Sequence, residues 1–222
     1  MIEAVDLTCE RGERLLFSSL SFAAENGTLL RIAGPNGTGK TSLLRIMCGL
    51  LEPTAGEIRW KGGNIRRLRE DYWKDLVYVG HLNGVKDDLT VRENLRVSIL
   101  VAGRAASEER LAQALEAVGL AGFEDTMARF LSQGQRRRVA LARLYVSESV
   151  PLWILDEPFT ALDVRGVASL SALIARHIES GGTVVLTTHQ EVPVDAARRK
   201  QVDLGAAASA VTKVAEAEDV AC

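Results

Sequence analysis

A glycine-rich segment between an apolar run and a helical pattern constrains this chain more than any other feature. The segment GPNGTGKT, Gly34 to Thr41, follows the apolar run Thr28 to Ala33 and precedes helical character from Thr41 to Leu50. Glycines let the backbone curl so that successive N–H groups face one anion, and a helix starting there adds its positive end. The pattern G-x-x-x-x-G-K-[ST] therefore predicts a strand, a phosphate-binding loop and a helix.

Each part of this loop has an expected contact with a nucleotide. Lys40 would reach the β- and γ-phosphates as a point charge, and the Thr41 hydroxyl would hold Mg²⁺. The predicted binding residues are Gly34, Pro35, Asn36, Gly37, Thr38, Gly39, Lys40 and Thr41.

A pair of carboxylates follows a second apolar run, Pro151 to Leu155. We expect Asp156 to bind Mg²⁺ directly or through water. Glu157, one residue further on, would polarise the attacking water. A lone acidic pair at the end of a strand is more commonly a helix cap or a solvated turn, but the phosphate loop upstream favours nucleotide hydrolysis.

A third motif, LSQGQ from Leu131 to Gln135, opens a predicted helix. Ser132 is a favoured N-cap, and Gln135 three residues later completes the pattern of a capping box. On its own the motif indicates only a capped helix. The functional alternative is an anion site, with the Ser132 hydroxyl and the Gly134 N–H as donors at the helix N-terminus.

Apolar runs alternate with helical patterns along the rest of the chain. The runs Leu76 to Val79, 151–155 and Thr183 to Thr187 predict buried strands, the last two of them parallel, and Val164 to Glu179 predicts the helix between those two. Residues 84–148 are mainly helical in pattern, with one apolar stripe formed by Leu111, Leu115, Val118 and Leu120. This order predicts an α/β core with a helical insert.

Shorter features lie at the two ends. Residues 2–7 and 20–24 predict strands around a turn at Arg11 to Glu13. The end, from Gly205 to Cys222, is rich in alanine. It is interpreted as a frayed helix, a disordered tail or a remnant of cloning.

Composition excludes several classes of protein. The 222 residues have a formal net charge of −2, with 25% charged and 47% apolar residues, so no basic balance favours nucleic acid. The longest apolar runs have about six residues, whereas a bilayer span needs about twenty. Met1 to Asp6 has no secretory signal pattern. Cys9, Cys48 and Cys222 lack metal-site spacing, so we expect free thiols in a reducing cytoplasm.

Taken in this order, the three motifs resemble those of ABC-type ATPase subunits, over residues 1 to about 205. The resemblance implies an α/β fold in which a P-loop NTPase core of ABC type carries a helical subdomain, at about 84–148, and an antiparallel β subdomain. It also implies a head-to-tail dimer around two ATP molecules. Ser132, Gly134 and Gln135 belong to the loop that would cover the γ-phosphate bound to the other copy.

The same resemblance assigns two further elements. His189 matches the switch histidine that contacts the γ-phosphate, the alternative being a surface histidine after a strand. The segment 161–163 matches the loop that links the two sites across the dimer. His177 lies on a helix with no motif around it, so we expect it to be solvated.

Two positions depart from the family pattern. Where these ATPases usually place an aromatic residue under the adenine, this chain has Arg11, whose guanidinium plane can also stack on a base. The hinge after Leu76 to Gly80 usually carries a glutamine that reaches Mg²⁺ and the lytic water, but here it has His81 and then Leu82. His81 either takes over this role, leaves a weaker Mg²⁺ contact, or only packs at the hinge.

Several segments resemble more narrowly the ATP-binding subunits of bacterial cytochrome c maturation systems. They are Cys9 to Arg14, Gly80-His81, Leu120 to Asp125, Leu152 to Asp163 and Thr187 to Gln190. This resemblance implies a peripheral ATPase on the cytoplasmic face of the inner membrane, bound to the membrane-spanning subunits of that system. Hydrolysis would drive haem export or release of a haem-loaded periplasmic chaperone. No direct haem binding is expected, because the sequence has no Cys-x-x-Cys-His.

Three other interpretations stay open. The chain could serve an ABC transporter for another substrate, which only the narrower segments argue against. A soluble ABC ATPase acting on DNA or ribosomes would carry coiled-coil insertions or a second ATPase domain, and this sequence shows neither. A regulatory module that binds ATP without hydrolysis is disfavoured by Glu157 and His189.

Overall fold

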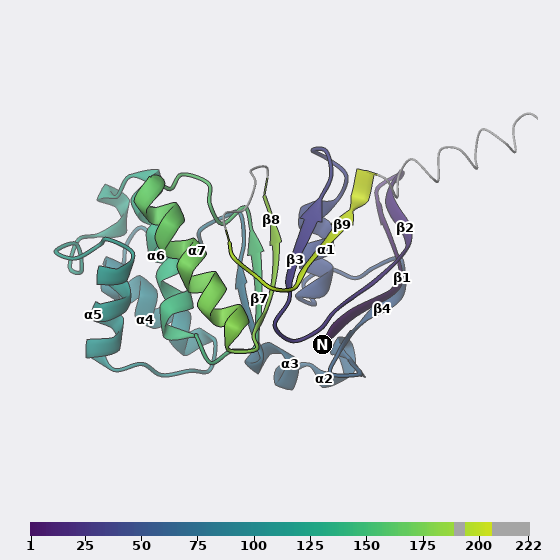
Figure 1. The fold of residues 1–222 in the computed structure, drawn as a ribbon. Coiled ribbons are helices and arrows are strands. Elements are labelled where there is room, and N and C mark those ends of the chain that lie inside the picture. The colour runs from purple at the N-terminus through teal and green to yellow at the C-terminus, as the bar shows by residue number, and fades with distance from the viewer. Residues whose placement is uncertain (189–193, 206–222) are drawn as a thin grey trace, which may run out of the picture.

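The chain folds into three layers, shown in Figure 1. The structure, a computed structural model, describes residues 1–188 and 194–205. An antiparallel sheet lies at the right of the figure, a parallel sheet lies in the centre, and a group of helices lies at the left. The predicted α/β fold with an antiparallel β part and a helical part is confirmed. No helix within the described ranges is both long and apolar enough to span a bilayer.

The antiparallel sheet has the strand order β2-β1-β4-β5. Its first two strands are longer than predicted, because alternate polar residues face outward and break the apolar runs that the sequence shows. The hairpin turns at Gly12 and Glu13, as expected. The strands are β1 (Ile2–Arg11), β2 (Arg14–Ala24), β4 (Ala55–Trp60) and β5 (Gly63–Asn64).

The parallel sheet has the strand order β6-β7-β8-β3-β9, so β6 and β9 are its edges. Strands β6 and β8 occupy the residues predicted for them. Strand β9 was not predicted, since it is a largely exposed polar edge strand with no apolar pattern. The strands are β3 (Leu29–Ala33), β6 (Leu76–Val79), β7 (Leu152–Asp156), β8 (Thr183–Thr187) and β9 (Arg199–Asp203).

Both faces of the parallel sheet are covered, which explains why its central strands are uninterrupted apolar runs. On one face, Ile154 of β7 packs in a cluster with α1 (Lys40–Met47) and the antiparallel sheet. On the other face, Trp153 and Leu155 pack against α7 (Val164–Glu179), the helix predicted at these residues. Two short helices, α2 (Ile65–Leu68) and α3 (Glu70–Lys74), lead into β6.

The helices between β6 and β7 have an apolar cluster of their own. Leu111, Leu115 and Leu120 are fully buried in this cluster, and Val118 packs against it, as the predicted stripe requires. We call this group of helices and their loops, residues 85–146, the helical unit. Its members are α4 (Val91–Val101), α5 (Glu108–Ala117), the 3₁₀ turn Ala128–Phe130 and α6 (Gln133–Val146).

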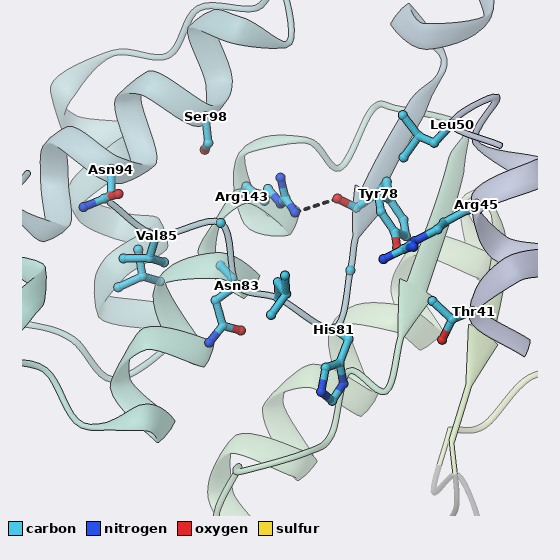
Figure 2. Close-up of a pocket in the computed structure, with 15 residues that line it drawn as sticks. Thr41, Arg45, Leu50, Tyr78, His81, Asn83, Val85, Asn94, Ser98 and Arg143 are labelled. Atoms are coloured by element: carbon cyan, nitrogen blue, oxygen red, sulfur yellow. Dashed lines mark hydrogen bonds between the residues drawn. The ribbon is translucent and has the colours of Figure 1, made fainter. Parts of the chain in front are cut away.

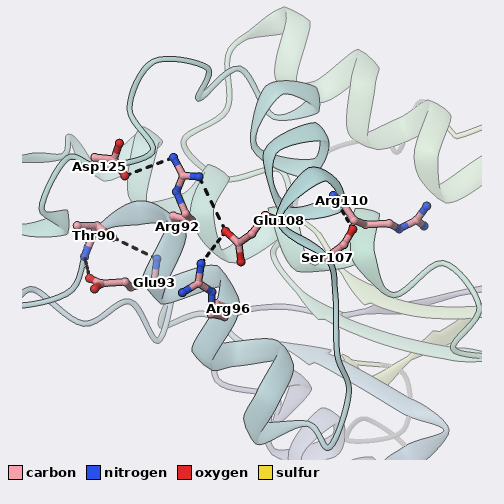
Figure 3. Close-up of polar contacts among 8 residues, drawn as sticks. All are labelled: Thr90, Arg92, Glu93, Arg96, Ser107, Glu108, Arg110 and Asp125. Carbon is pink, nitrogen blue, oxygen red and sulfur yellow. Dashed lines mark hydrogen bonds and ion pairs between the residues drawn. The ribbon is translucent and has the colours of Figure 1, made fainter.

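Polar contacts at the start of α4 fix where that helix begins (Figure 3). Thr90 and Glu93 form a reciprocal capping box. Glu108 of α5 bridges Arg92, at 3.9 Å, and Arg96, at 2.6 Å. Such exposed ion pairs contribute about 0–1 kcal/mol each, so the apolar cluster holds the helices together and the ion pairs align them.

His177 is buried, so the prediction that it is solvated is wrong. Its ring is 4% exposed and stacks on Trp153, with ring centroids 3.8 Å apart and planes 5° apart. Its Nδ1 lies 3.2 Å from the carbonyl oxygen of Glu148, so Nδ1–H donates to that acceptor. Burial lowers the pKa of His177 to about 4. The missed signal is its spacing of three from Ile174 and seven from Leu170, both on the buried stripe of α7.

Candidate functional site

The glycine-rich loop joins β3 to α1 and closes around its own lysine. Lys40 Nζ donates to the carbonyl oxygens of Gly34, at 2.7 Å, and Pro35, at 3.0 Å. The Thr38 hydroxyl donates to the same Pro35 oxygen at 2.9 Å. Gly39 has φ +97°, and a Cβ there would lie 3.1 Å from a side chain of β2, so glycine is required. The ammonium group therefore stands inside a curled loop at the N-terminus of α1.

The acidic pair lies at the carboxyl end of β7, directly beside this loop. Thr41 Oγ1 donates to Asp156 Oδ2 at 3.0 Å, and Thr187 Oγ1 donates to Asp156 Oδ1 at 2.6 Å. Asp156 is 2% exposed, so these hydroxyls compensate for the loss of water around its carboxylate. The Thr187 oxygen also accepts from the Glu157 N–H at 3.0 Å. The start of α1, which follows β3, and the end of β7 thus bring the two predicted Mg²⁺ ligands, Thr41 and Asp156, into contact, although β8 lies between those two strands.

Glu157 adopts a backbone conformation that is rare for a residue with a side chain. Its φ is +49°, in the left-handed region, which costs free energy unless the surroundings hold it. Glu157 and Asp156 line a pocket of about 460 Å³ together with Asn36, Gly37 and Lys40 of the loop. The structure therefore collects most of the predicted phosphate-loop residues and both carboxylates in one cavity.

The LSQGQ motif opens α6 as predicted. The Gln135 N–H donates to Ser132 Oγ at 3.2 Å, and the Ser132 N–H donates to Gln135 Oε1 at 2.9 Å, so the capping box is confirmed. Gly134 lies under the 161–163 loop, where an added Cβ would come within 3.0 Å of the Ala161 oxygen. None of the three motif residues lines the phosphate pocket that the described residues of this chain form.

The remaining predicted contacts are Arg11, His81 and His189. Arg11 ends β1 and is exposed. The guanidinium of Arg14 instead lies beside the phosphate loop, 3.7 Å from the position that a Gly37 Cβ would take. The hairpin register, which pairs Arg11 with Arg14, would have pointed to this second arginine. His189 lies outside the described residues.

His81 is an exposed residue on the hinge after β6, and it borders two cavities. One is the phosphate pocket. The other, shown in Figure 2, is a cavity of about 480 Å³ between α1 and β6 on one side and the helical unit on the other. Leu82, the next residue, is 81% exposed. The hinge therefore separates the phosphate pocket from a second cavity that reaches the helical unit.

The fold and the site together define an ATPase of the ABC class. Its components are a phosphate loop, a buried aspartate at the end of another strand of the same parallel sheet, and a capped LSQGQ helix on a separate helical unit. The ABC transporter family matches residues 17–160 of the chain.

Relatives place the chain more narrowly. It is 53% identical over 203 residues, 91% of this chain and 98% of the relative, to the cytochrome c biogenesis ATP-binding export protein CcmA of Nitrosospira multiformis. It is 49% identical over 205 residues, 92% of this chain and 99% of the relative, to the protein of that name in Vibrio cholerae. The chain belongs to the ABC transporter family and, within it, to the family of these export proteins.

Solved structures agree with this assignment. The dimeric structure of MJ0796, described as a bacterial ABC transporter cassette, has a TM-score of 0.77 and 27% identity, with 92% of this chain and 95% of that chain covered. The dimeric post-hydrolysis state of the same cassette, bound to ADP and Pi, has a TM-score of 0.79 and 25% identity, with the same coverage. The protein is therefore an ATP-binding and ATP-hydrolysing member of its family.

Proposed function

We propose that this chain is the ATP-hydrolysing subunit of a bacterial ABC transporter complex for cytochrome c maturation. In this proposal hydrolysis drives haem export or the release of a haem-loaded periplasmic chaperone. The observation that carries it is 53% identity over 98% of the length of a cytochrome c biogenesis export protein. Residues 1–205 form one ABC ATPase domain with a helical subdomain at about 84–148, and the predicted tail 206–222 lies outside the described residues.

ATP is held by the phosphate loop and by an arginine of the β1–β2 hairpin, and Lys40, Thr41 and Asp156 line the phosphate pocket. Lys40 and the loop N–H groups bind the β- and γ-phosphates, and Arg11 or Arg14 stacks on the base. Thr41 and Asp156 fit Mg²⁺, because a hydroxyl and a carboxylate 3.0 Å apart are the hard oxygen donors that this ion prefers. Bound Mg²⁺ neutralises charge on the phosphate oxygens.

Glu157 is the general base of the proposed reaction. Its carboxylate takes a proton from the attacking water, whose oxygen bonds to the γ-phosphorus while the bond to the β–γ bridging oxygen breaks. ADP and inorganic phosphate are the products. His189 contacts the γ-phosphate, and His81 contributes from the hinge.

Two copies complete each other's sites. Two dimeric structures of the cassette MJ0796 share this fold. The LSQGQ residues Ser132, Gly134 and Gln135 do not line the phosphate pocket of their own chain. The N-terminus of α6 is suited to the γ-phosphate bound by the second copy. ATP then favours the closed dimer, because both γ-phosphates are fully contacted only in that state.

The second cavity is the proposed docking site for the membrane-spanning subunits. Exposed apolar side chains of Leu82 and Leu50 stand at this cavity, and α4 exposes Leu100 and Val101. Apolar groups gathered on a surface indicate an interaction site. A partner bound there would contact the hinge that carries His81, so dimer closure and partner movement would be linked.

We expect neither nucleic acid nor haem to bind this subunit, and we place it on the cytoplasmic face of the inner membrane.

Affinity purification from detergent-solubilised bacterial membranes tests the proposal. The wild type is compared with Lys40→Ala, which removes the phosphate contact, and with Leu82→Asp, which places a charge at the docking cavity. The eluates are scanned for haem absorbance, their partners are identified, and phosphate release is measured. We expect the wild type to recover haem-bearing membrane partners and to hydrolyse ATP. Lys40→Ala should recover the same partners but show no ATPase activity. Leu82→Asp should keep ATPase activity but recover no membrane partners.

Other outcomes would redirect the proposal. Membrane partners without haem would assign the same ATPase to an exporter of another substrate. The absence of any membrane partner would favour a soluble ABC ATPase. Full ATPase activity in Lys40→Ala would refute the site itself.

A further inference from the structure

Arginines of the helical unit cover the outer edge of β6. Strand β6 pairs with β7 on one side only, so every second carbonyl along it points away from the sheet. Arg104 donates to the carbonyl oxygens of Lys74 and Leu76, each at 3.0 Å. Arg143 donates to that of Tyr78 at 2.5 Å (Figure 2). These guanidinium groups thus replace the missing neighbour strand.

Arg137 of α6 continues this row and reaches further than the others. Its Nη1 donates to the Gly80 carbonyl at 2.9 Å and to Asn83 Oδ1 at 3.2 Å, both on the hinge. Its Nη2 donates to the carbonyl oxygens of Asp156, at 2.9 Å, and Glu157, at 2.8 Å. One guanidinium therefore joins the hinge, the acidic pair and the helix that carries the LSQGQ motif.

The surroundings of Arg137 make this junction rigid. The residue is 4% exposed, and burial lowers the pKa of its guanidinium, while the nearby Asp156 and Glu157 carboxylates raise it. A planar fork with donors at fixed angles can satisfy acceptors on two segments at once, whereas a lysine ammonium is a single point charge. The two carbonyls on Nη2 flank the left-handed φ of Glu157, so the contact helps to hold the backbone that aims its carboxylate.

We propose that Arg137 is a positioning residue that sets the Glu157 carboxylate according to the position of the hinge and of α6. A movement of the hinge, or a rotation of the helical unit, is transmitted through this guanidinium to the backbone of Glu157. This inference rests on the proposed role of Glu157 as general base. It adds a physical connection between the cavity at the hinge, where the membrane-spanning subunits are proposed to dock, and ATP hydrolysis at Glu157.

The test compares steady-state ATPase kinetics of the full chain as wild type, Arg137→Lys and Arg137→Gln. Because the phosphate loop is untouched, we expect kcat to fall about tenfold or more in both variants while KM for ATP stays within about threefold. Arg104→Lys is the matched control: it lies on the same strand edge, touches neither the hinge nor the acidic pair, and should keep kcat within about twofold.

The outcomes separate a positioning role from a structural one. Wild-type kcat in Arg137→Lys would overturn the proposal, because charge alone would then suffice. A parallel change of kcat and KM, or an equal loss in Arg104→Lys, would assign Arg137 to general stability and overturn it as well. Glu157→Gln is measured alongside. Retained turnover in Glu157→Gln would refute the role of Glu157 as general base. Lost turnover in Glu157→Gln, together with wild-type kinetics in the Arg137 variants, would refute only the positioning role of Arg137.

A second variant keeps the test valid if the Arg137 variants do not fold. Asn83 is partly exposed on the hinge loop, and Asn83→Ala removes one of the four acceptors without disturbing the core. We expect kcat about threefold lower with unchanged KM. An unchanged kcat in this folded variant would overturn the connection between the hinge and Glu157.

Discussion

The buried imidazole of His177 should make the stability of the chain depend on pH in a defined window. An unfolded chain protonates this ring near its ordinary pKa of 6.5, whereas in the folded chain burial lowers the pKa to about 4. The unfolded state therefore binds the proton first as pH falls, and stability is lost between about pH 6.5 and 4. This difference in pKa corresponds to about 3 kcal/mol in total, of which about 2 kcal/mol falls between pH 7.5 and 5.0.

Urea unfolding of the wild type and of His177→Gln, at both pH values, measures this contribution. The variant loses the stacking on Trp153 but also the titration, so we expect the unfolding free energy of the wild type to fall by about 2 kcal/mol more than that of the variant. His81→Gln, which alters an exposed histidine, is the control and should follow the wild type. The chain has three histidines, so their NMR titrations can be assigned by variant. Equal pH dependence in wild type and His177→Gln, or a His177 resonance titrating near pH 6.5, would refute the reasoning.

Three further predictions concern the site. The Glu157→Gln variant should bind ATP without hydrolysing it and should elute as a dimer in gel filtration with ATP. Normal phosphate release by this variant would refute the role of Glu157 as general base. Thr187→Val removes the hydroxyl that bonds both Asp156 and the Glu157 N–H. It should lower the unfolding free energy by about 1–3 kcal/mol and raise the Mg²⁺ concentration needed for half-maximal activity, while Thr187→Ser should restore both; a Val variant equal to wild type would contradict this. Ser132→Ala should cost about 1 kcal/mol in urea unfolding because it removes an N-cap, and it should lower ATPase activity in the dimer; no loss of stability would argue against the cap.

The centre of the site was predictable because each of its parts is a local signal. The phosphate loop is a contiguous pattern with a strand before it and a helix after it. Asp156 ends an apolar run that had to be a central strand. Strands of one parallel sheet present their carboxyl ends at the same edge, so the phosphate loop after β3 and Asp156 at the end of β7 lie on the same side of the sheet, where Thr41 contacts Asp156.

The contacts that hold this centre in place were not predictable from pattern. Arg136, Arg137 and Arg138 are three successive cations on one helix, and the sequence does not distinguish Arg137, which is buried, from its two partly buried neighbours. The spacing of His177 on the apolar stripe of α7 indicates burial, but the sequence does not show that its ring stacks on Trp153. In both cases the neighbour that decides, a carbonyl edge or a tryptophan face, comes from a distant part of the chain.

The covered edge of β6 bears on how this chain avoids associating with others. An open edge strand offers its carbonyl and N–H groups to any extended segment that comes near, which is a route to aggregation. Arg104, Arg143 and Arg137 occupy the outward carbonyls of β6 and its continuation. If the helical unit loosened before the sheet did, that edge would open while the rest of the sheet was still intact. The helices therefore also act as a shield against strand addition.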